Sequence, residues 1–93
     1  FPIVKRDFSF ILDNEVSYKR IEDCVLSIND NLIKEVKLFD VFKEGKIEKS
    51  KKSISISVLL SSGQRTLDEK NIEKISKKIV TSMEKKFNAT LRD

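Results

Sequence analysis

A two-residue alternation that begins at Ser53 and holds to Val58, within the segment 53–60, constrains the fold more than any other feature of this chain. Serines alternate with branched aliphatic residues along the segment Ser-Ile-Ser-Ile-Ser-Val-Leu-Leu. Successive side chains of a β-strand point to opposite sides of a sheet, so the segment predicts a strand with one apolar face and one face of small polar groups. Such a strand fits a sheet that is covered by other elements on one side only.

The rest of the chain supplies the partners of this strand. Hydrophobic periodicity predicts a strand over 5–13 with Phe8, Phe10 and Leu12 inward, a helix from a cap at Ser17 to about Ile28, a strand over 32–42, a helix over about 67–87, and a short strand over 89–92. Thr66 and Glu69 have the spacing of a capping box at the start of the second helix, and Asn88 suits its left-handed end. The order β-α-β-β-α-β predicts an α+β fold of the ferredoxin-like, split β-α-β type, a four-stranded antiparallel sheet with two helices on one face.

The second predicted strand changes phase in the middle. Val36 and Leu38 share one face of an ideal strand, whereas Phe39 falls on the other. A bulge or a change of strand partner near Leu38 and Phe39 would reconcile the two apolar patterns. Without a bulge, Asp40 and Phe42 would share the face of Val36 and Leu38; with one, both residues turn to the open face of the sheet. The sequence leaves that choice open.

The open face is expected to be hydrophilic and uncrowded. The alternation places on it the residues Lys5, Asp7, Ser9, Ser53, Ser55, Ser57, Thr90 and Arg92. Residues 43–52 contain five lysines around Gly45 and form either a solvated hairpin connection or a contact to an RNA backbone.

Composition favours a binding module over an enzyme. The 93 residues suffice for one domain, 1–93, and they include no histidine, the commonest general base and metal ligand. The single cysteine, Cys24, excludes an internal disulfide and a thiolate metal cluster and is expected to pack as a small apolar side chain. Two glycines cannot build a phosphate-binding loop. We therefore expect no cofactor, no metal and no catalysis in this domain.

The first residues, the hydrophobicity and the net charge of the chain lead to expectations about its parent protein, its compartment and its partners. Because it begins with Phe1 and Pro2, we expect a domain excised from a longer protein. No apolar run reaches 18 residues, so no membrane span or membrane partner is expected, and a free thiol fits the cytoplasm. The net charge of +4 is compatible with nucleic acid without requiring it.

The residues typical of three common functions of this fold are absent from this sequence. An RNA-recognition motif would place aromatic side chains outward on its third strand, where this chain has serines. A metal carrier would have a cysteine pair after its first strand, and an amino-acid sensor would have glycine there. The loop Asp13-Asn14-Glu15-Val16 has neither.

Five short motifs, in order along nearly the whole chain, resemble one family. They are Phe1-Pro2-Ile3-Val4-Lys5-Arg6-Asp7, Leu38-Phe39-Asp40-Val41-Phe42, Lys51-Lys52-Ser53, Arg65-Thr66-Leu67 with Glu69, and Ala89-Thr90-Leu91-Arg92. Together they are similar to the ferredoxin-fold anticodon-binding domain at the C-terminus of the bacterial phenylalanyl-tRNA synthetase β subunit. Two departures stand out: Phe42 replaces the usual tyrosine, and residues 45–50 lack the usual proline and second glycine.

The resemblance implies a function. The domain would bind the anticodon stem-loop of phenylalanine tRNA, as part of an ATP- and magnesium-dependent phenylalanine–tRNA ligase whose reaction takes place on the α subunit. Its partners would be that subunit and the other β-subunit domains. The family's anticodon-contacting positions match Asp40, Phe42, Ser53 and Arg92, and Lys51 and Lys52 would neutralise phosphates. The alternative is a structural or dimerising domain that packs its open sheet on a partner protein. Small polar residues on that face disfavour this alternative.

Overall fold

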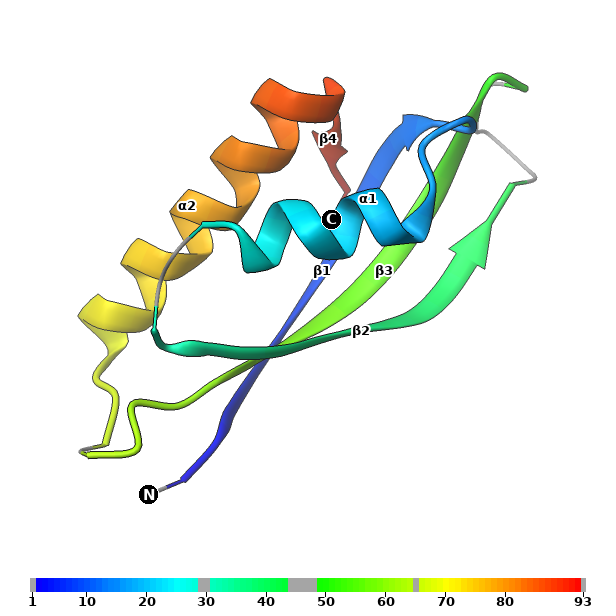
Figure 1. Cartoon of the computed structure of the whole chain (residues 1–93). Helices are drawn as coiled ribbons and strands as arrows, with labels where there is room; N and C mark the ends of the chain where they lie inside the picture. The colour runs from blue at the N-terminus through cyan, green and yellow to red at the C-terminus, as the bar shows by residue number, and fades with distance from the viewer. Residues whose placement is uncertain (1, 29–30, 44–48, 65, 93) are drawn as a thin grey trace.

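The computed structural model describes residues 2–28, 31–43, 49–64 and 66–92. Its elements, in chain order, are β1 (Val4–Asp13), α1 (Tyr18–Leu26), β2 (Ile33–Phe42), β3 (Lys51–Leu60), α2 (Glu69–Phe87) and β4 (Thr90–Leu91). The predicted order β-α-β-β-α-β is confirmed, and each predicted element lies within a few residues of its expected bounds (Figure 1).

The four strands form one antiparallel sheet in the order β2-β3-β1-β4. Strands β1 and β3 lie in the centre, although β2 separates them in the chain, and this order is that of the split β-α-β fold. Both helices lie on the same side of the sheet (Figure 1). The other side is the open face, and it carries the site described below.

The core lies between the sheet and the two helices. The aliphatic face of β3 is buried, as are Phe10 and Leu12 of β1, which confirms their predicted inward direction. The helices contribute the apolar positions that the periodicity predicts: Ile21, Cys24 and Val25 from α1, and Ile72, Ile75, Ile79, Met83 and Phe87 from α2. Burial of this apolar surface is the main term that favours folding, at about 25 cal/mol per Å².

The ends of α1 agree in part with the prediction. Ser17 is the N-cap, and its hydroxyl accepts a hydrogen bond from the backbone N–H of Arg20. The helix ends at Leu26, two residues before the expected end at Ile28, and the hydroxyl of Ser27 donates to the carbonyl of Cys24 at 2.9 Å. Residues 29 and 30, expected to stop the helix, lie outside the described residues.

The start of α2 differs from the prediction. Asp68 is the N-cap in place of Thr66, and its carboxylate accepts the backbone N–H of Asn71 at 2.8 Å. The helix accordingly begins at Glu69 and not at Leu67. Its end is as expected, because Asn88 adopts the left-handed conformation with φ 54° and ψ 34°. Among the described residues, neither helix combines the length and the apolar character that crossing a membrane requires.

Candidate nucleic-acid interface

A bulge in β2 decides which residues face the open side of the sheet. Leu38 pairs with Ile56 of β3, but the next pair joins Asp40 to Ser55, so Phe39 is the extra residue of a register shift. The phase change expected near Leu38 and Phe39 is therefore confirmed. Ile56 is buried under the helices, whereas the serines of β3 lie on the opposite side of the strand.

The bulge brings the predicted residues of β2 and β3 onto one face. Beyond it, Asp40 lies beside Ser55 and Phe42 lies beside Ser53. Since paired residues on neighbouring strands share a face, Asp40 and Phe42 both turn to the open side. Phe42 is 40% exposed there, an unusual state for a phenylalanine ring on a sheet.

Arg92 joins this group from the far edge of the sheet. Its backbone N–H donates to the carbonyl of Ser9 at 2.7 Å, which extends the pairing of the two-residue strand β4. Its guanidinium reaches across β1 and donates to the Ser53 hydroxyl at 3.1 Å. The same guanidinium lies over the Phe42 ring, 5.8 Å from its centroid, within range of a cation–π attraction.

The serines of the open face are more enclosed than expected. Ser53 is only 3% exposed, with Arg92 hydrogen-bonded to its hydroxyl. Ser55 shares a hydrogen bond with Ser9 at 2.7 Å, and Ser57 donates to the Asp7 carboxylate at 2.7 Å. The expectation of an uncrowded face is wrong, because longer side chains on the flanking strands cover the short ones in the centre. The Ser53 hydroxyl is therefore already engaged by Arg92 and has little surface open to a ligand.

The two adjacent lysines of the predicted site lie on different faces. Lys51 pairs with Asp13 and shares the parity of Ser53, so it lies on the open side. Lys52 pairs with the buried Leu12, so it lies on the helix side. Its ammonium donates to the carbonyl of Val16 at 2.6 Å, and burial, followed by the nearby positive charge of Lys43, lowers its pKa. Lys52 therefore does not join the cluster of Asp40, Phe42, Ser53 and Arg92.

Phe39 is an open-face residue for which the sequence predicted no function. Its ring is 56% exposed, and it lies on the same edge strand as Asp40 and Phe42. The phase conflict in the sequence pointed to this position as a bulge without indicating a role. The lysine-rich connection is described only in part, since residues 44–48, including Gly45 and Lys46, lie outside the described residues.

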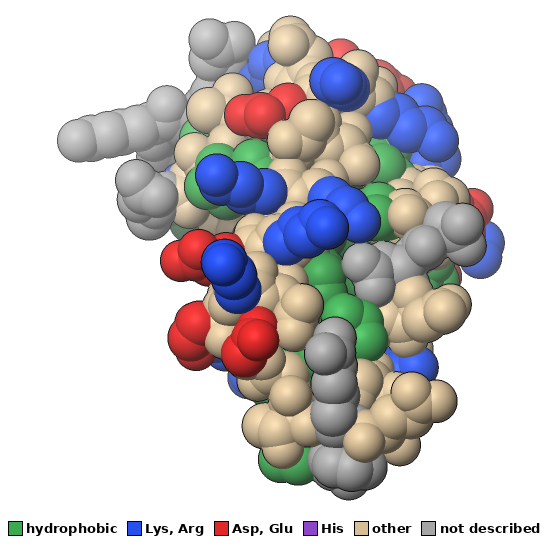
Figure 2. Space-filling view, turned by 90° about the vertical axis from the view of Figure 1, so that its left-hand side faces the viewer, with side chains coloured by type: hydrophobic (Ala, Val, Ile, Leu, Met, Phe, Trp, Pro, Cys, Tyr) green, Lys and Arg blue, Asp and Glu red, His purple; other side chains and the backbone are tan. Residues whose placement is uncertain are grey.

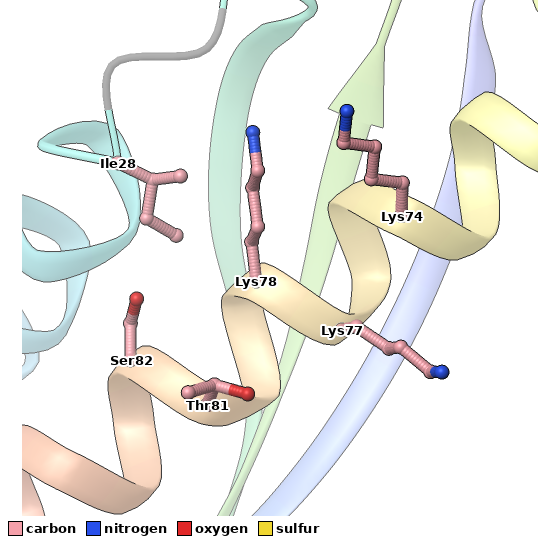
Figure 3. A pocket seen from close by; sticks show the side chains of 6 residues that line it. All are labelled: Ile28, Lys74, Lys77, Lys78, Thr81 and Ser82. Carbon is pink, nitrogen blue, oxygen red and sulfur yellow. The ribbon is translucent and has the colours of Figure 1, made fainter.

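The helix side carries a different kind of surface. Figure 2 shows lysine and arginine side chains spread over the α2 side of the molecule, with hydrophobic side chains visible between them. A shallow hollow of about 430 Å³ lies there between the end of α1 and α2. Its lining is Ile28, Lys74, Lys77, Lys78, Thr81 and Ser82. In Figure 3, Ile28 points toward Ser82 and Lys78, whereas Lys77 extends away from them.

The two surfaces differ in the chemistry they offer. The open face combines an exposed carboxylate, an aromatic ring and a guanidinium, which together can stack on a base and hydrogen-bond its edge. The helix side offers ammonium groups around an apolar floor, suited to nonspecific attraction of anions. Cys24 lines a second hollow, which shares Ile28 and Ser82 with the first. It is 3% exposed, and burial raises the pKa of its thiol, so it is poorly suited to nucleophilic chemistry.

Comparison with known proteins supports a nucleic-acid interface. A family model described as "Ferredoxin-fold anticodon binding domain" matches residues 1–92. The phenylalanine–tRNA ligase beta subunit of Bacteroides thetaiotaomicron is 45% identical over 92 residues, that of Porphyromonas gingivalis is 40% identical over 92 residues, and that of Desulfotalea psychrophila is 38% identical over 93 residues. These matches cover 99%, 99% and 100% of this chain, which spans only 11% of the length of each relative.

Proposed function

The chain belongs to the ferredoxin-fold anticodon-binding domain family, and on that premise we propose that it binds the anticodon stem-loop of phenylalanine tRNA on the open face of its sheet. The longer protein would be the β subunit of a phenylalanine–tRNA ligase, acting in the cytoplasm with its α subunit. Binding, not catalysis, is the role assigned to this domain.

The bulge in β2 is the observation that carries the proposal. It turns Asp40 and Phe42 to the side of the sheet where Arg92 is hydrogen-bonded to Ser53. Strands β2 and β3 and the residue after β4 thus bring together a carboxylate, a ring, a hydroxyl and a guanidinium from distant parts of the sequence. A polar cluster with an exposed aromatic ring is the kind of surface that holds an unpaired base.

The proposed recognition of guanine rests on the acceptors of a carboxylate. The phenylalanine anticodon begins with guanine, whose Watson–Crick edge presents two adjacent donors, N1–H and N2–H. The Asp40 carboxylate can accept both, whereas adenine and uracil do not offer that pair. Phe42 would stack beneath the base and contribute about 1–3 kcal/mol without discriminating among bases. Because Phe42 has no hydroxyl, it acts through its ring alone.

Arg92 would change partners when the base arrives. In the free domain its guanidinium lies over Phe42 and donates to Ser53, where a stacked base would compete with it. Displacement would make its donors available to the phosphate or the base, and would uncover Ser53. Lys51, on the same face, would add an attraction for the backbone that does not depend on sequence.

ATP and magnesium would serve the ligase outside this domain. Within the described part of the chain, no three acidic or cysteine side chains gather into a group that could hold a metal ion. The residues that the proposal uses are those of a binding surface only.

The alternative of a sheet that packs on a partner protein has less support. The centre of the open face consists mainly of serines that are hydrogen-bonded to Asp7, Ser9 and Arg92, with the half-buried Ile11 beside Ser53. An interface between proteins has a core enriched in apolar and aromatic residues, which the centre of this face lacks.

Substitution of Asp40 tests the proposal through base preference. The intact chain should bind a stem-loop with guanine at the first anticodon position more tightly than one with adenine, in a fluorescence anisotropy titration. Asp40→Ala should reduce this preference by roughly 5- to 150-fold, since a bidentate contact is worth about 1–3 kcal/mol.

Asp7→Ala is the matched control, because Asp7 is also an exposed aspartate on the open face and lies beside Ser57, two residues along β3 from Ser55. It should leave the preference unchanged. If Asp40→Ala preserves the guanine preference, Asp40 does not recognise the base and the assignment is wrong.

A further inference from the structure

Phe39 is an exposed aromatic side chain that nothing in the described fold requires. Its ring is 56% exposed, the largest exposed fraction among the described phenylalanines. An exposed apolar ring on the edge strand β2 does not contribute the stabilisation that its burial would bring. It also makes the edge strand more prone to pair with a strand of another molecule. Phe42 is a second exposed ring on the same face of this strand, and exposed apolar side chains that lie near one another mark a surface that binds a ligand.

The bulge gives this ring a definite direction. Leu38 faces the helix side with Ile56, and Val41 does so with Ile54, so the two residues between them lie on the open side. Those two residues are Phe39 and Asp40. The ring therefore lies beside the carboxylate that we assign to base recognition.

Phe39 and Phe42 are spaced for two bases. The positions of β3 that oppose Asp40 and Phe42 are Ser55 and Ser53, two residues apart. A strand rises about 3.3 Å per residue, which separates the two rows by about 7 Å. That separation is about twice the 3.4 Å between stacked bases in a duplex, so a single strand on these rings would be extended and its bases unstacked from one another.

We propose that Phe39 is a second stacking platform, which takes the base adjoining the one held by Asp40 and Phe42. This inference rests on the proposed function and adds a second nucleotide to its site. Stacking on a ring tolerates any base, because every base has an aromatic face. The second position would thus contribute affinity without sequence preference, while Asp40 supplies the preference at the first.

The surroundings of the ring favour RNA over a protein surface. On the open side its neighbours are Asp40, the hydrogen-bonded Ser55 and the charged Lys37. The exposed apolar residues Leu38 and Val41 lie on the opposite side of the strand, so they do not extend an apolar patch around the ring. Exposed rings bordered by polar groups suit bases, which have an apolar face and a polar edge.

The first test compares two substitutions on β2. Phe39→Leu keeps an apolar side chain and removes the aromatic face. It should weaken stem-loop binding roughly 5- to 150-fold, the factor that stacking on one ring is worth, and leave the guanine-to-adenine ratio intact. Val41→Ala, at an exposed apolar residue of the same strand on its other face, should bind like the intact chain. Equal affinities of Phe39→Leu and the intact chain would overturn the inference and favour a protein contact for the ring.

The second test uses the absence of tryptophan from the sequence. Phe39→Trp introduces the only tryptophan, whose emission should be quenched when the stem-loop binds, because a base stacks on the indole. A stem-loop that lacks the base adjoining the first anticodon position should bind with little quenching. Val41→Trp should show little quenching with either RNA.

The outcomes separate this inference from the proposed function. If the intact chain does not bind the stem-loop, the proposed function is wrong and the platform fails with it. If the intact chain binds with guanine preference and the emission of Phe39→Trp is unaffected, only the second platform is wrong.

Discussion

Lys51 and Lys52 are neighbours in the sequence, but their side chains lie on opposite faces of the sheet and have different contacts. Both belong to the same basic segment, and the sequence assigned both to phosphate contacts. The pleat of β3 puts Lys51 on the open side and Lys52 on the helix side, where its ammonium is bonded to the carbonyl of Val16 at 2.6 Å. Burial lowers the pKa of Lys52, a sign that its charge is less well solvated than that of a surface lysine.

Alanine substitutions of the two lysines should therefore have different effects. Lys51→Ala should reduce the slope of log affinity against log salt by about 0.7–0.9, because one phosphate contact and its released counterion are lost. Lys52→Ala should leave the slope unchanged and lower the midpoint of urea unfolding, since it leaves the carbonyl of Val16 without its partner. Anisotropy titrations at several salt concentrations and urea denaturation measure both. Equal salt slopes for Lys51→Ala and the intact chain would remove Lys51 from the interface.

At the scale of elements, the start of α2 depends on a choice between two caps. Thr66 with Glu69 and Asp68 with Asn71 both offer a side-chain oxygen three residues before a backbone N–H. The structure uses Asp68 and buries Leu67, which precedes the cap, together with Ile72. These two are the positions of a hydrophobic staple, so packing in the core selects the later cap.

Asp68→Ala should accordingly destabilise the domain by about 1 kcal/mol, the usual cost of losing an N-cap. Thr66→Ala should change the free energy of unfolding by less than about 0.5 kcal/mol, as is usual for a surface position. Urea denaturation of both variants measures the difference. A larger loss for Thr66→Ala than for Asp68→Ala would restore the cap expected from the sequence.

The bulge in β2 marks the limit of what the sequence can predict at this scale. Val36 and Phe39 fall on opposite faces of a regular strand, so a regular strand could not bury the apolar residues before and after this point on the same side. The sequence therefore predicts an irregularity in the strand. Which face gains Asp40 depends on the pairing with β3, a contact between segments far apart in the chain. The elements themselves followed from local periodicity, whereas the bond from Arg92 to Ser53 joins residues 39 positions apart and has no local signal.

The whole molecule presents two candidate surfaces for a polyanion. Its extents are 45 × 21 × 20 Å, and the sheet separates the open face from the helix side. The helix side carries the lysines around the hollow lined by Ile28 and Ser82 (Figure 3). The open face carries the cluster that we propose for base recognition, with the acidic residues Asp7 and Asp40 among its cations. Nonspecific electrostatic attraction alone would place the RNA on the lysines of the helix side, whereas base recognition would place it on the open face. The location of the bound RNA therefore distinguishes the two modes of binding.

An NMR titration of the isotope-labelled chain with the phenylalanine anticodon stem-loop tests this location most directly. Backbone and side-chain resonances of Asp40, Phe42, Ser53 and Arg92 should shift together and saturate at one equivalent of RNA. Resonances of Ile28, Thr81 and Ser82 on the helix side should stay in place. Shifts concentrated around the lysines of α2, with the open face unchanged, would contradict the account.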